Sequence, residues 1–436
     1  MEAGRIYFPE DRVPLLRLIP MGLQHVVAMF GATVLAPILM GFNPQVALFF
    51  SGIGTLLFIL ITRFKVPSYL GSSFAFIGPV LAITGGQAGR IPEALCGIAG
   101  AAVLYGLTAA ITIRYGSRWI DRLMPPVVTG AVVALIGLNL ASSSIVNALN
   151  KDFVVATRAD GLNLLIAAVT FLTAALVAVY LRGFLRLLPV LLSVLVGYGL
   201  AAALGHLDPK ALDAIRAAPW LGLPPFTAPR LSLGAIAVIA PVFVVLVAEN
   251  KGHIAAISGY MQRDLSPHLG RAYLGDAVAT FVSALGGGTP QTTYAENMGV
   301  MAITRVFAVA NFLVAALTAL LLGICPKFGA VILSIPAPVL GGVTLVLYGL
   351  ITLMGVKIWL DARVDFAQHR NLIVAGASII VATGLGLKGI TIGGLNLAGI
   401  AVGTVLALVL NVIMPAERTL AVVAAAEAPR AAAGRD

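Results

Sequence analysis

The chain has 436 residues, of which 59% are apolar and 11% are charged, and it carries a net charge of +10. A soluble domain has roughly 25% charged residues, so this chain has too few to cover a water-facing surface. Its hydrophobicity excludes disorder, and two cysteines exclude a disulfide scaffold. Basic residues that lie singly between apolar runs argue against nucleic-acid binding. The composition therefore indicates a polytopic membrane protein.

Proline, glycine and charge clusters divide the sequence into about fourteen apolar segments. The first is too long for a signal peptide and is expected to be a retained span. The segments 68–84 and 289–304 are short for a membrane helix, which needs ~20 residues, and both contain Gly, Pro, Ser or Thr. The expected spans are 14–40, 44–62, 68–84, 93–113, 124–147, 161–181, 184–204, 232–257, 271–286, 289–304, 306–325, 328–355, 371–387 and 393–414.

The distribution of basic residues predicts the orientation of these spans. With the N-terminus in the cytoplasm, most Lys and Arg residues fall in cytoplasmic loops, as the positive-inside rule requires. We therefore expect a multi-pass protein of the inner (plasma) membrane with both termini in the cytoplasm. Residues 1–13 form the cytoplasmic N-terminus, 205–231 the longest extracytoplasmic connection, and 415–436 a disordered cytoplasmic tail.

Two motifs occur twice, in the same order and at nearly the same separation, which is about half the chain. PVVTGAVVALIGL at 126–138 resembles PVLGGVTLVLYGL at 338–350, and SSFAF at 72–76 resembles TTYAE at 292–296. This pattern indicates an internal duplication. Because each half would contain an odd number of spans, the second copy must be inverted in the membrane, an architecture found in many secondary transporters.

The SSFAF and TTYAE motifs fall in the two short segments. Backbone groups at membrane depth must be hydrogen-bonded or line a cavity, so these segments cannot be ordinary spanning helices. We expect each to be a short extended piece that leads into a half-helix, and we expect the two pieces to meet near the midplane. Their free amides and positive helix ends would then form a polar ligand site.

A few ionisable residues lie inside the expected spans: Glu249, Asp276, Glu296, His25 and His253. A charge at the bilayer centre costs at least ~2.5–3.5 kcal/mol, so these residues are functional candidates. Glu249 and His253 are four residues apart and share a helix face, where they can exchange a proton. Glu296 lies at the expected start of a half-helix, where the helix dipole favours a carboxylate.

Asp276 is as well explained as a supporting hydrogen-bonding group as by direct involvement. His25 is expected to be a structural link between the first span and segment 72–76. Phe74 and Tyr294 hold matching positions in the two motifs, where their rings could stack on a flat ligand.

Other chemistries lack support in the sequence. No set of His, Cys, Asp and Glu has the spacing of a tight metal site, and we expect no cofactor. A phosphate-binding loop and a nucleophile elbow are also missing, so ATP-driven transport and an enzymatic function are not expected. Two carboxylates and a histidine leave proton and sodium coupling equally open.

ENMGVMAITR at 296–305 resembles the signature of the nucleobase–ascorbate transporter family, also called nucleobase:cation symporter-2. That signature is a polar residue, Asn, any residue, Gly, four residues, Thr and often Arg. QHVVAMFGATVLAP at 24–37, YLGSSFAFIGPV at 69–80 and AENKGH at 248–253 are also similar to family motifs. The resemblance covers nearly the whole chain. TTYAEN and His253 are most similar to the bacterial uracil:proton symporters, whereas purine and xanthine members usually carry Gln at the position of Glu296.

The resemblance implies an all-α fold of fourteen transmembrane segments arranged as a 7+7 inverted repeat, in which spans 3 and 10 are the short ones. It implies a core domain from spans 1–4 and 8–11, at 14–113 and 232–325, and a gate domain from spans 5–7 and 12–14, at 124–204 and 328–414. Family members commonly form homodimers through the gate domain. Substrate lies between core and gate, and the core moves in an elevator-like step.

The resemblance also implies roles for individual residues. Glu249 would accept a ring N–H and Glu296 would hold the opposite edge of the base, while amides near Phe74 and Ala295 would donate to a ring carbonyl. Tyr294 would also contact the base, and Tyr348 would close over it. His253 would pair with Glu249, and both would take part with Glu296 in proton coupling. The supporting residues would be His25, Asp276, Ser73, Asn297 and Thr293.

Three positions depart from the uracil symporters. Ala295 replaces a Gly, Asp276 replaces an Asn, and Lys251 lies between Glu249 and His253 where a neutral residue is expected. Lys251 is two positions from each and should point to another face of the helix.

These observations predict proton-coupled uptake of uracil or a closely related pyrimidine. A purine, xanthine or uric acid symporter of the same family is the first alternative. An anion transporter of the same fold is disfavoured by the two carboxylates, and a non-transporting membrane receptor remains a further alternative.

Overall fold

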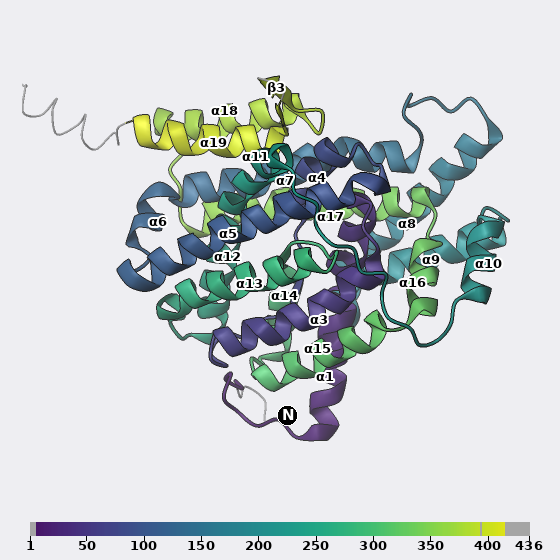
Figure 1. Cartoon of the computed structure of the whole chain (residues 1–436), viewed down its shortest axis with the longest axis horizontal. Coiled ribbons are helices and arrows are strands. Elements are labelled where there is room, and N and C mark those ends of the chain that lie inside the picture. Colours follow the sequence, from purple (N-terminus) through teal and green to yellow (C-terminus); the bar gives the residue numbers. More distant parts are fainter. Residues whose placement is uncertain (1–5, 393–394, 415–436) are drawn as a thin grey trace, which may run out of the picture.

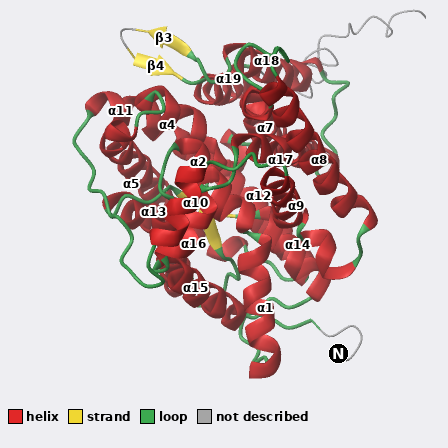
Figure 2. Ribbon diagram, turned by 90° about the vertical axis from the view of Figure 1, so that its right-hand side faces the viewer, coloured by secondary structure: helices red, strands yellow, loops and turns green. Residues whose placement is uncertain are grey.

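The computed structural model describes residues 6–392 and 395–414, and the expected disordered tail at 415–436 lies outside them. The described chain is mostly helical (Figure 1), with two short two-stranded ribbons (Figure 2). Its first part consists of α1 (Leu15–Ala28), a π-helical turn (Gly31–Leu35), α2 (Ala36–Met40), α3 (Pro44–Ile61), β1 (Leu70–Ser72), α4 (Ile77–Thr84), α5 (Ile91–Tyr115), α6 (Arg118–Leu123), α7 (Pro126–Ala148), α8 (Arg158–Tyr180) and α9 (Pro189–Ala203).

The second part begins with α10 (Pro209–Ala217), which lies in the long connection after α9. It continues with α11 (Leu233–Ile239), α12 (Phe243–Met261), α13 (Leu269–Leu285), β2 (Gln291–Thr293), α14 (Ala295–Thr304), α15 (Val309–Gly323), α16 (Pro326–Leu333), α17 (Ala337–Asp361), α18 (His369–Leu385), β3 (Ile390–Ile392), β4 (Leu395–Leu397) and α19 (Gly399–Ile413).

Local sequence fixes several helix ends. Asn43 accepts a hydrogen bond from the Gln45 amide at 2.8 Å and caps α3. Gly85, with φ +57°, ends α4 in the left-handed conformation that favours glycine.

The long helices pack in two groups. In the first, α3, α5, α13 and α15 lie side by side, and α1 packs on α15 (Figure 1). In the second, α7 packs on α17, α18 and α19, and α8 packs on α9 and α17. α12 touches both groups, through α5 and α7. The division into a core and a gate domain, and the relative movement of the two, remain predictions.

Glycines allow α7 and α17 to approach closely. A Cβ on Gly130 would lie 2.8 Å from the Gly355 carbonyl, and one on Gly137 would lie 2.9 Å from the Thr352 amide. These distances leave no room for a side chain. The helices that carry the two copies of the duplicated motif, α7 and α17, therefore pack directly on each other.

Within the described residues, six helices are long and apolar enough to cross a membrane, or up to 8 if each of two bent pairs counts as one span. The expectation of a multi-pass membrane protein agrees with this. Shorter apolar helices, including Pro189–Ala203, His369–Leu385 and Gly399–Ile413, contribute further segments. The count of fourteen spans remains a prediction.

Three expected spans differ from the observed helices. The first span is bent by 55° between α1 and the second part, Thr33–Met40, where Pro37 cannot donate the next helical hydrogen bond. A single span over 328–355 is wrong, because Pro336 is extended and separates α16 from α17. The last span begins at Gly399 rather than at 393, since β4 precedes it.

Candidate functional site

The two short segments meet in the middle of the molecule. β1 and β2 pair antiparallel, with Leu70 opposite Thr293 and Ser72 opposite Gln291, and they lie among the surrounding helices (Figure 2). β1 leads into a 3₁₀ turn (Phe74–Phe76) and α4, while β2 leads directly into α14. The expectation of two extended pieces that lead into half-helices is confirmed.

The register of this ribbon follows the duplication seen in the sequence. Gly71 pairs with Thr292, and the counterparts of these residues in the other copy are Gln291 and Ser72, which also pair. The amide of Ser73 donates to the Pro290 carbonyl at 2.9 Å, as expected for the counterpart of the Leu70–Thr293 pair. The two copies of the short motif are therefore related by a local two-fold axis through the β1–β2 ribbon.

Hydroxyl groups of the neighbouring helices satisfy the outer edges of the ribbon. On the β1 side, Thr55 of α3 accepts from the Leu70 amide at 2.9 Å and Ser51 donates to the Leu70 carbonyl. On the β2 side, Thr280 of α13 both donates to the Gln291 carbonyl and accepts from its amide, each at 3.0 Å. Extended backbone that is buried in the protein needs such partners.

These hydroxyl residues were not identified from the sequence. The available signal was the presence of Ser and Thr within the otherwise apolar segments 44–62 and 271–286.

Three aromatic rings gather where the ribbon ends. Phe74 lies edge-on to Tyr294, with ring centroids 6.1 Å apart, and edge-on to Tyr348 of α17 at the same distance. The Tyr294 hydroxyl donates to the Ser72 carbonyl and is thereby fixed to the opposite strand. The Tyr348 hydroxyl is buried and has no hydrogen-bond partner among the described residues. The rings come from both copies of the short motif and from the second helix group.

The two glutamates lie beside these rings. Glu296 is in the first turn of α14, and Ala295 is its first residue, so their amides have no partner within the helix. Glu249, on α12, lies within electrostatic range of Glu296 and of the Ser73 hydroxyl. Its Oε2 atom is buried without a hydrogen-bond partner among the described residues. A buried polar atom of this kind costs about 1–3 kcal/mol unless something binds it.

The polar residues that follow Glu249 on α12 contact different neighbours. Asn250 donates to Asp276 of α13 at 2.5 Å, and Lys251 Nζ lies 2.8 Å from Asp121 of α6. His253 Nδ1 lies 2.8 Å from Thr293 Oγ1 of β2. The structure thus gives His253 the partner Thr293, whereas the expected partner was Glu249. Asp276 contacts α12 through Asn250, and its part in the site remains a prediction.

His25 links the first helix to α14. Its Nδ1 lies 2.9 Å from Asn297 Oδ1, and Asn297 in turn donates to the Tyr69 carbonyl at 3.2 Å. The expected link to segment 72–76 is corrected, because His25 reaches β1 only through Asn297 and the residue before the strand. This bridge fixes the start of the half-helix that carries Glu296.

Within the described residues, no group of three or more His, Cys, Asp or Glu side chains could hold a metal ion. The groups that the site gathers are two carboxylates, which can form hydrogen bonds, and aromatic rings, which can cover a flat molecule.

Comparison with known proteins agrees with this arrangement. A family model described as "Permease family" matches residues 16–390. "Putative pyrimidine permease RutG" from Escherichia coli (strain K12) is 45% identical, covering 95% of this chain and 92% of its own length. The "Uracil permease" of Bacillus caldolyticus is 41% identical, covering 93% of this chain and 94% of its own length.

A solved structure of SLC26A9 has a similar fold, with a TM-score of 0.62 at 11% identity, covering 92% of this chain and 65% of that one. The transmembrane domain of the cyanobacterium bicarbonate transporter BicA gives 0.58 at 14% identity, covering 94% of this chain and 100% of that one. The fold is therefore shared with membrane transporters. The match over most of its length shows that this chain belongs to the nucleobase–ascorbate transporter family of permeases and is not an enzyme.

Proposed function

We propose that this protein carries out proton-coupled uptake of uracil or a closely related pyrimidine across the inner membrane. The observation that carries the proposal is the position of Glu249 and Glu296 beside the aromatic rings, at the crossing of β1 and β2. Uracil is flat and presents two N–H donors and two carbonyl acceptors. Carboxylates accept from the donors, free amides donate to the carbonyls, and aromatic rings cover the faces.

Selectivity follows from the same groups. Glu249 Oε2 and the Tyr348 hydroxyl are both buried without a protein partner among the described residues. A base that leaves such groups unpaired loses about 1–3 kcal/mol for each one, which favours a ligand of matching pattern. The names of the relatives, a pyrimidine permease and a uracil permease, support a pyrimidine as that ligand.

Proton movement is assigned to Glu249, Glu296 and His253. Burial beside a second carboxylate makes it unfavourable for both glutamates to be charged, so binding of a base and of a proton are coupled. His253, held by Thr293 of β2, lies on the same helix and can relay a proton. One charge that crosses 100 mV supplies ~2.3 kcal/mol, which is enough to drive accumulation.

The transport step is proposed to be elevator-like. Phe74 and Glu296 follow the short strands, which pack on α3 and α13 of the first helix group, and Glu249 lies on α12, which touches both groups. Tyr348 belongs to the second group. Movement of one group along the other would carry the base across the membrane. We further propose that the protein forms homodimers through the second group and has both termini in the cytoplasm.

Uptake of radiolabelled uracil into proteoliposomes tests the proposal, with an imposed inward proton gradient, with an inward sodium gradient and with neither. Accumulation is expected with the proton gradient alone. Unlabelled uracil, thymine, xanthine and uric acid are then added as competitors. Stronger competition by xanthine or uric acid than by unlabelled uracil would replace the pyrimidine with a purine. Binding of uracil without flux would indicate a receptor.

A further inference from the structure

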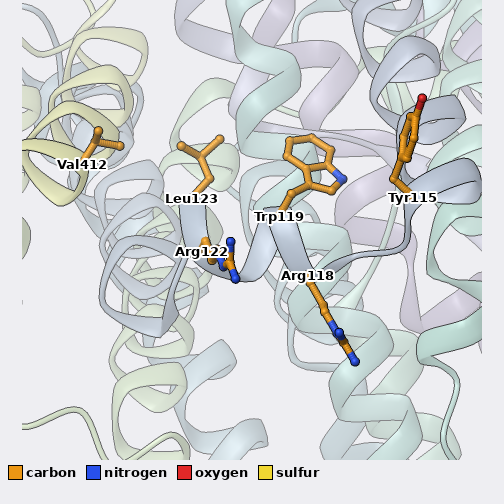
Figure 3. A pocket seen from close by; sticks show the side chains of 6 residues that line it. All are labelled: Tyr115, Arg118, Trp119, Arg122, Leu123 and Val412. Atoms are coloured by element: carbon orange, nitrogen blue, oxygen red, sulfur yellow. The ribbon is translucent and has the colours of Figure 1, made fainter.

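An open hollow of about 580 Å³ lies where α5 ends, beside α6 and α19. It is lined by Tyr115, Arg118, Trp119, Arg122, Leu123 and Val412 (Figure 3). In the view of Figure 3, Trp119 stands between Leu123 and Tyr115, and the Arg118 guanidinium extends away from the rings. The hollow is separate from the Glu249–Glu296 site.

The position of α6 places this hollow at the edge of the membrane. α6 is a short connection between α5 and α7, both of which are long and apolar enough to cross a bilayer. The residues between two successive spans lie at the level of the lipid headgroups. Trp and Tyr side chains are enriched at that depth, where one end of the ring system is apolar and the other is wet.

The two arginines have no counter-ion among the described residues. Arg118 and Arg122 are both exposed, and no side chain among the described residues forms a hydrogen bond or ion pair with either guanidinium. Asp121 lies between them but pairs with Lys251. By contrast, Arg370, which is close by, donates to Asn411 and to the Met414 carbonyl. Arg118 and Arg122 are four positions apart on α6 and share one face, so they can bind one anionic group together.

Apolar stripes on the flanking helices lead to the hollow. On α5, the exposed residues Val103, Leu107 and Ile111 follow at four-residue spacing and end at Tyr115. On α19, exposed Val405 and Val409 lead in the same way to Val412. Side chains at this spacing form a continuous face, here exposed outside the protein core. A ligand with an anionic head and apolar tails would match both the arginines and these stripes.

We propose that this hollow binds an anionic phospholipid, with its phosphate on Arg118 and Arg122 and its acyl chains along α5 and α19. The bound lipid would bridge α5 of the first helix group and α19 of the second at the connection between them. The proposed lipid site depends on α5 and α7 crossing the membrane, and it does not depend on which substrate the protein transports.

Native mass spectrometry of the purified protein tests the proposal. Phosphatidylglycerol and phosphatidylcholine with identical acyl chains are supplied in equal amounts to the wild type, to the R118Q/R122Q variant and to R17Q/R182Q. The last variant is the matched control, because Arg17 and Arg182 are exposed arginines outside the hollow. The wild type and control should retain phosphatidylglycerol roughly tenfold or more over phosphatidylcholine, because both arginines contribute near an anionic headgroup.

The R118Q/R122Q variant should lose most of this preference while its oligomeric state, thermal stability and uracil binding stay unchanged. An equal preference in all three proteins would overturn the proposal. So would displacement of the lipid by millimolar inorganic phosphate, which would indicate a simple anion site. A change of oligomeric state in R118Q/R122Q, with lipid retention unaltered, would instead assign the surface to a second copy of the chain.

Discussion

Lys251 Nζ lies 2.8 Å from Asp121 Oδ1 and also donates to the Met124 carbonyl at 3.1 Å. A lysine within the apolar helix α12 thus reaches the short helix α6, away from the face that carries Glu249 and His253. The pair joins the helix that holds the candidate site to the connection between the two helix groups. It explains how this chain accommodates a charge between two site residues.

We expect Asp121→Asn and Lys251→Met each to lower the melting temperature, because each leaves one member of the pair without its counter-ion. Since both side chains are partly exposed, their coupling should be about 0.2–1 kcal/mol. A double-mutant cycle followed by thermal unfolding in one detergent measures it. Strict additivity of the two single substitutions would show that the pair contributes nothing.

Glu249→Gln and Glu296→Gln are each expected to reduce gradient-driven uptake by 100-fold or more, because a neutral amide cannot both accept from the base and exchange a proton. Glu93→Gln is the control, since Glu93 pairs with Arg90 at the start of α5, outside the site. Uptake is measured in proteoliposomes at matched protein density. Wild-type rates in either variant would remove that glutamate from the proposed mechanism.

Gly137→Ala should destabilise the protein by about 1–3 kcal/mol, because the new methyl group would meet the backbone of α17 at Tyr348 and Thr352. It should also weaken substrate binding, since Tyr348 belongs to the proposed site. Gly349 is its counterpart in the second copy of the motif, and nothing lies within 4 Å of a Cβ built there. Gly349→Ala is therefore the matched control.

Melting temperature and uracil affinity are compared for these two glycine variants. Equal tolerance of both substitutions would contradict the close approach of α7 and α17 at Gly137.

Sequence patterns predicted the parts of this structure that depend on local order or on repetition. The SSFAF and TTYAE motifs identified both short segments, and their alignment even agrees with the pairing of Gly71 with Thr292. Membrane depth explains this success, because a polar, glycine-flanked stretch there has few permitted conformations.

Side-chain partners were harder to predict because they depend on how helices rotate about one another. Helical spacing placed Glu249 and His253 on one face of α12, but β2 supplies Thr293 to His253, and only tertiary packing brings His253 and Thr293 together. The same limit applies to Asp121, which is distant from Lys251 in sequence. The break before α17 was missed because the run from 328 is apolar on both sides of Pro336.

Thr280→Val tests whether a hydroxyl supports the ribbon. The substitution removes the partner of both the amide and the carbonyl of Gln291, so we expect a loss of about 1–3 kcal/mol in stability and impaired uptake. Thr318→Val is the control, because that hydroxyl bonds only to the Val314 carbonyl of its own helix, α15. Thermal unfolding and uptake are measured for both variants. Similar losses in both would show that the Thr280 hydroxyl does not support the ribbon more than an ordinary helix hydroxyl does.

The N-terminal segment provides a pH-dependent contact outside the spans. Arg263, just after α12, donates to Glu10 at 2.7 Å, and this hydrogen bond lowers the pKa of the Glu10 carboxyl below its ordinary value. Tyr7 pairs with the backbone on both sides of Val306, so the segment is joined to the chain that follows α14. The hydrogen bond between Glu10 and Arg263 therefore helps to hold the N-terminal segment beside the half-helix that carries Glu296.

Because the folded pKa of Glu10 is depressed, its stabilising contribution is present above the unfolded pKa and is lost as the pH falls through the folded value. Glu10→Gln should lower stability at pH 7 by no more than about 1 kcal/mol, since both side chains are nearly half exposed. The difference from wild type should shrink as the pH is reduced below about 4. Thermal unfolding from pH 7.5 to 3.5 measures this, and Glu93→Gln again serves as the control, because Glu93 pairs with Arg90 away from the N-terminal segment. If the stability difference between Glu10→Gln and wild type stays constant over this pH range, the charge of Glu10 does not hold the N-terminal segment in place.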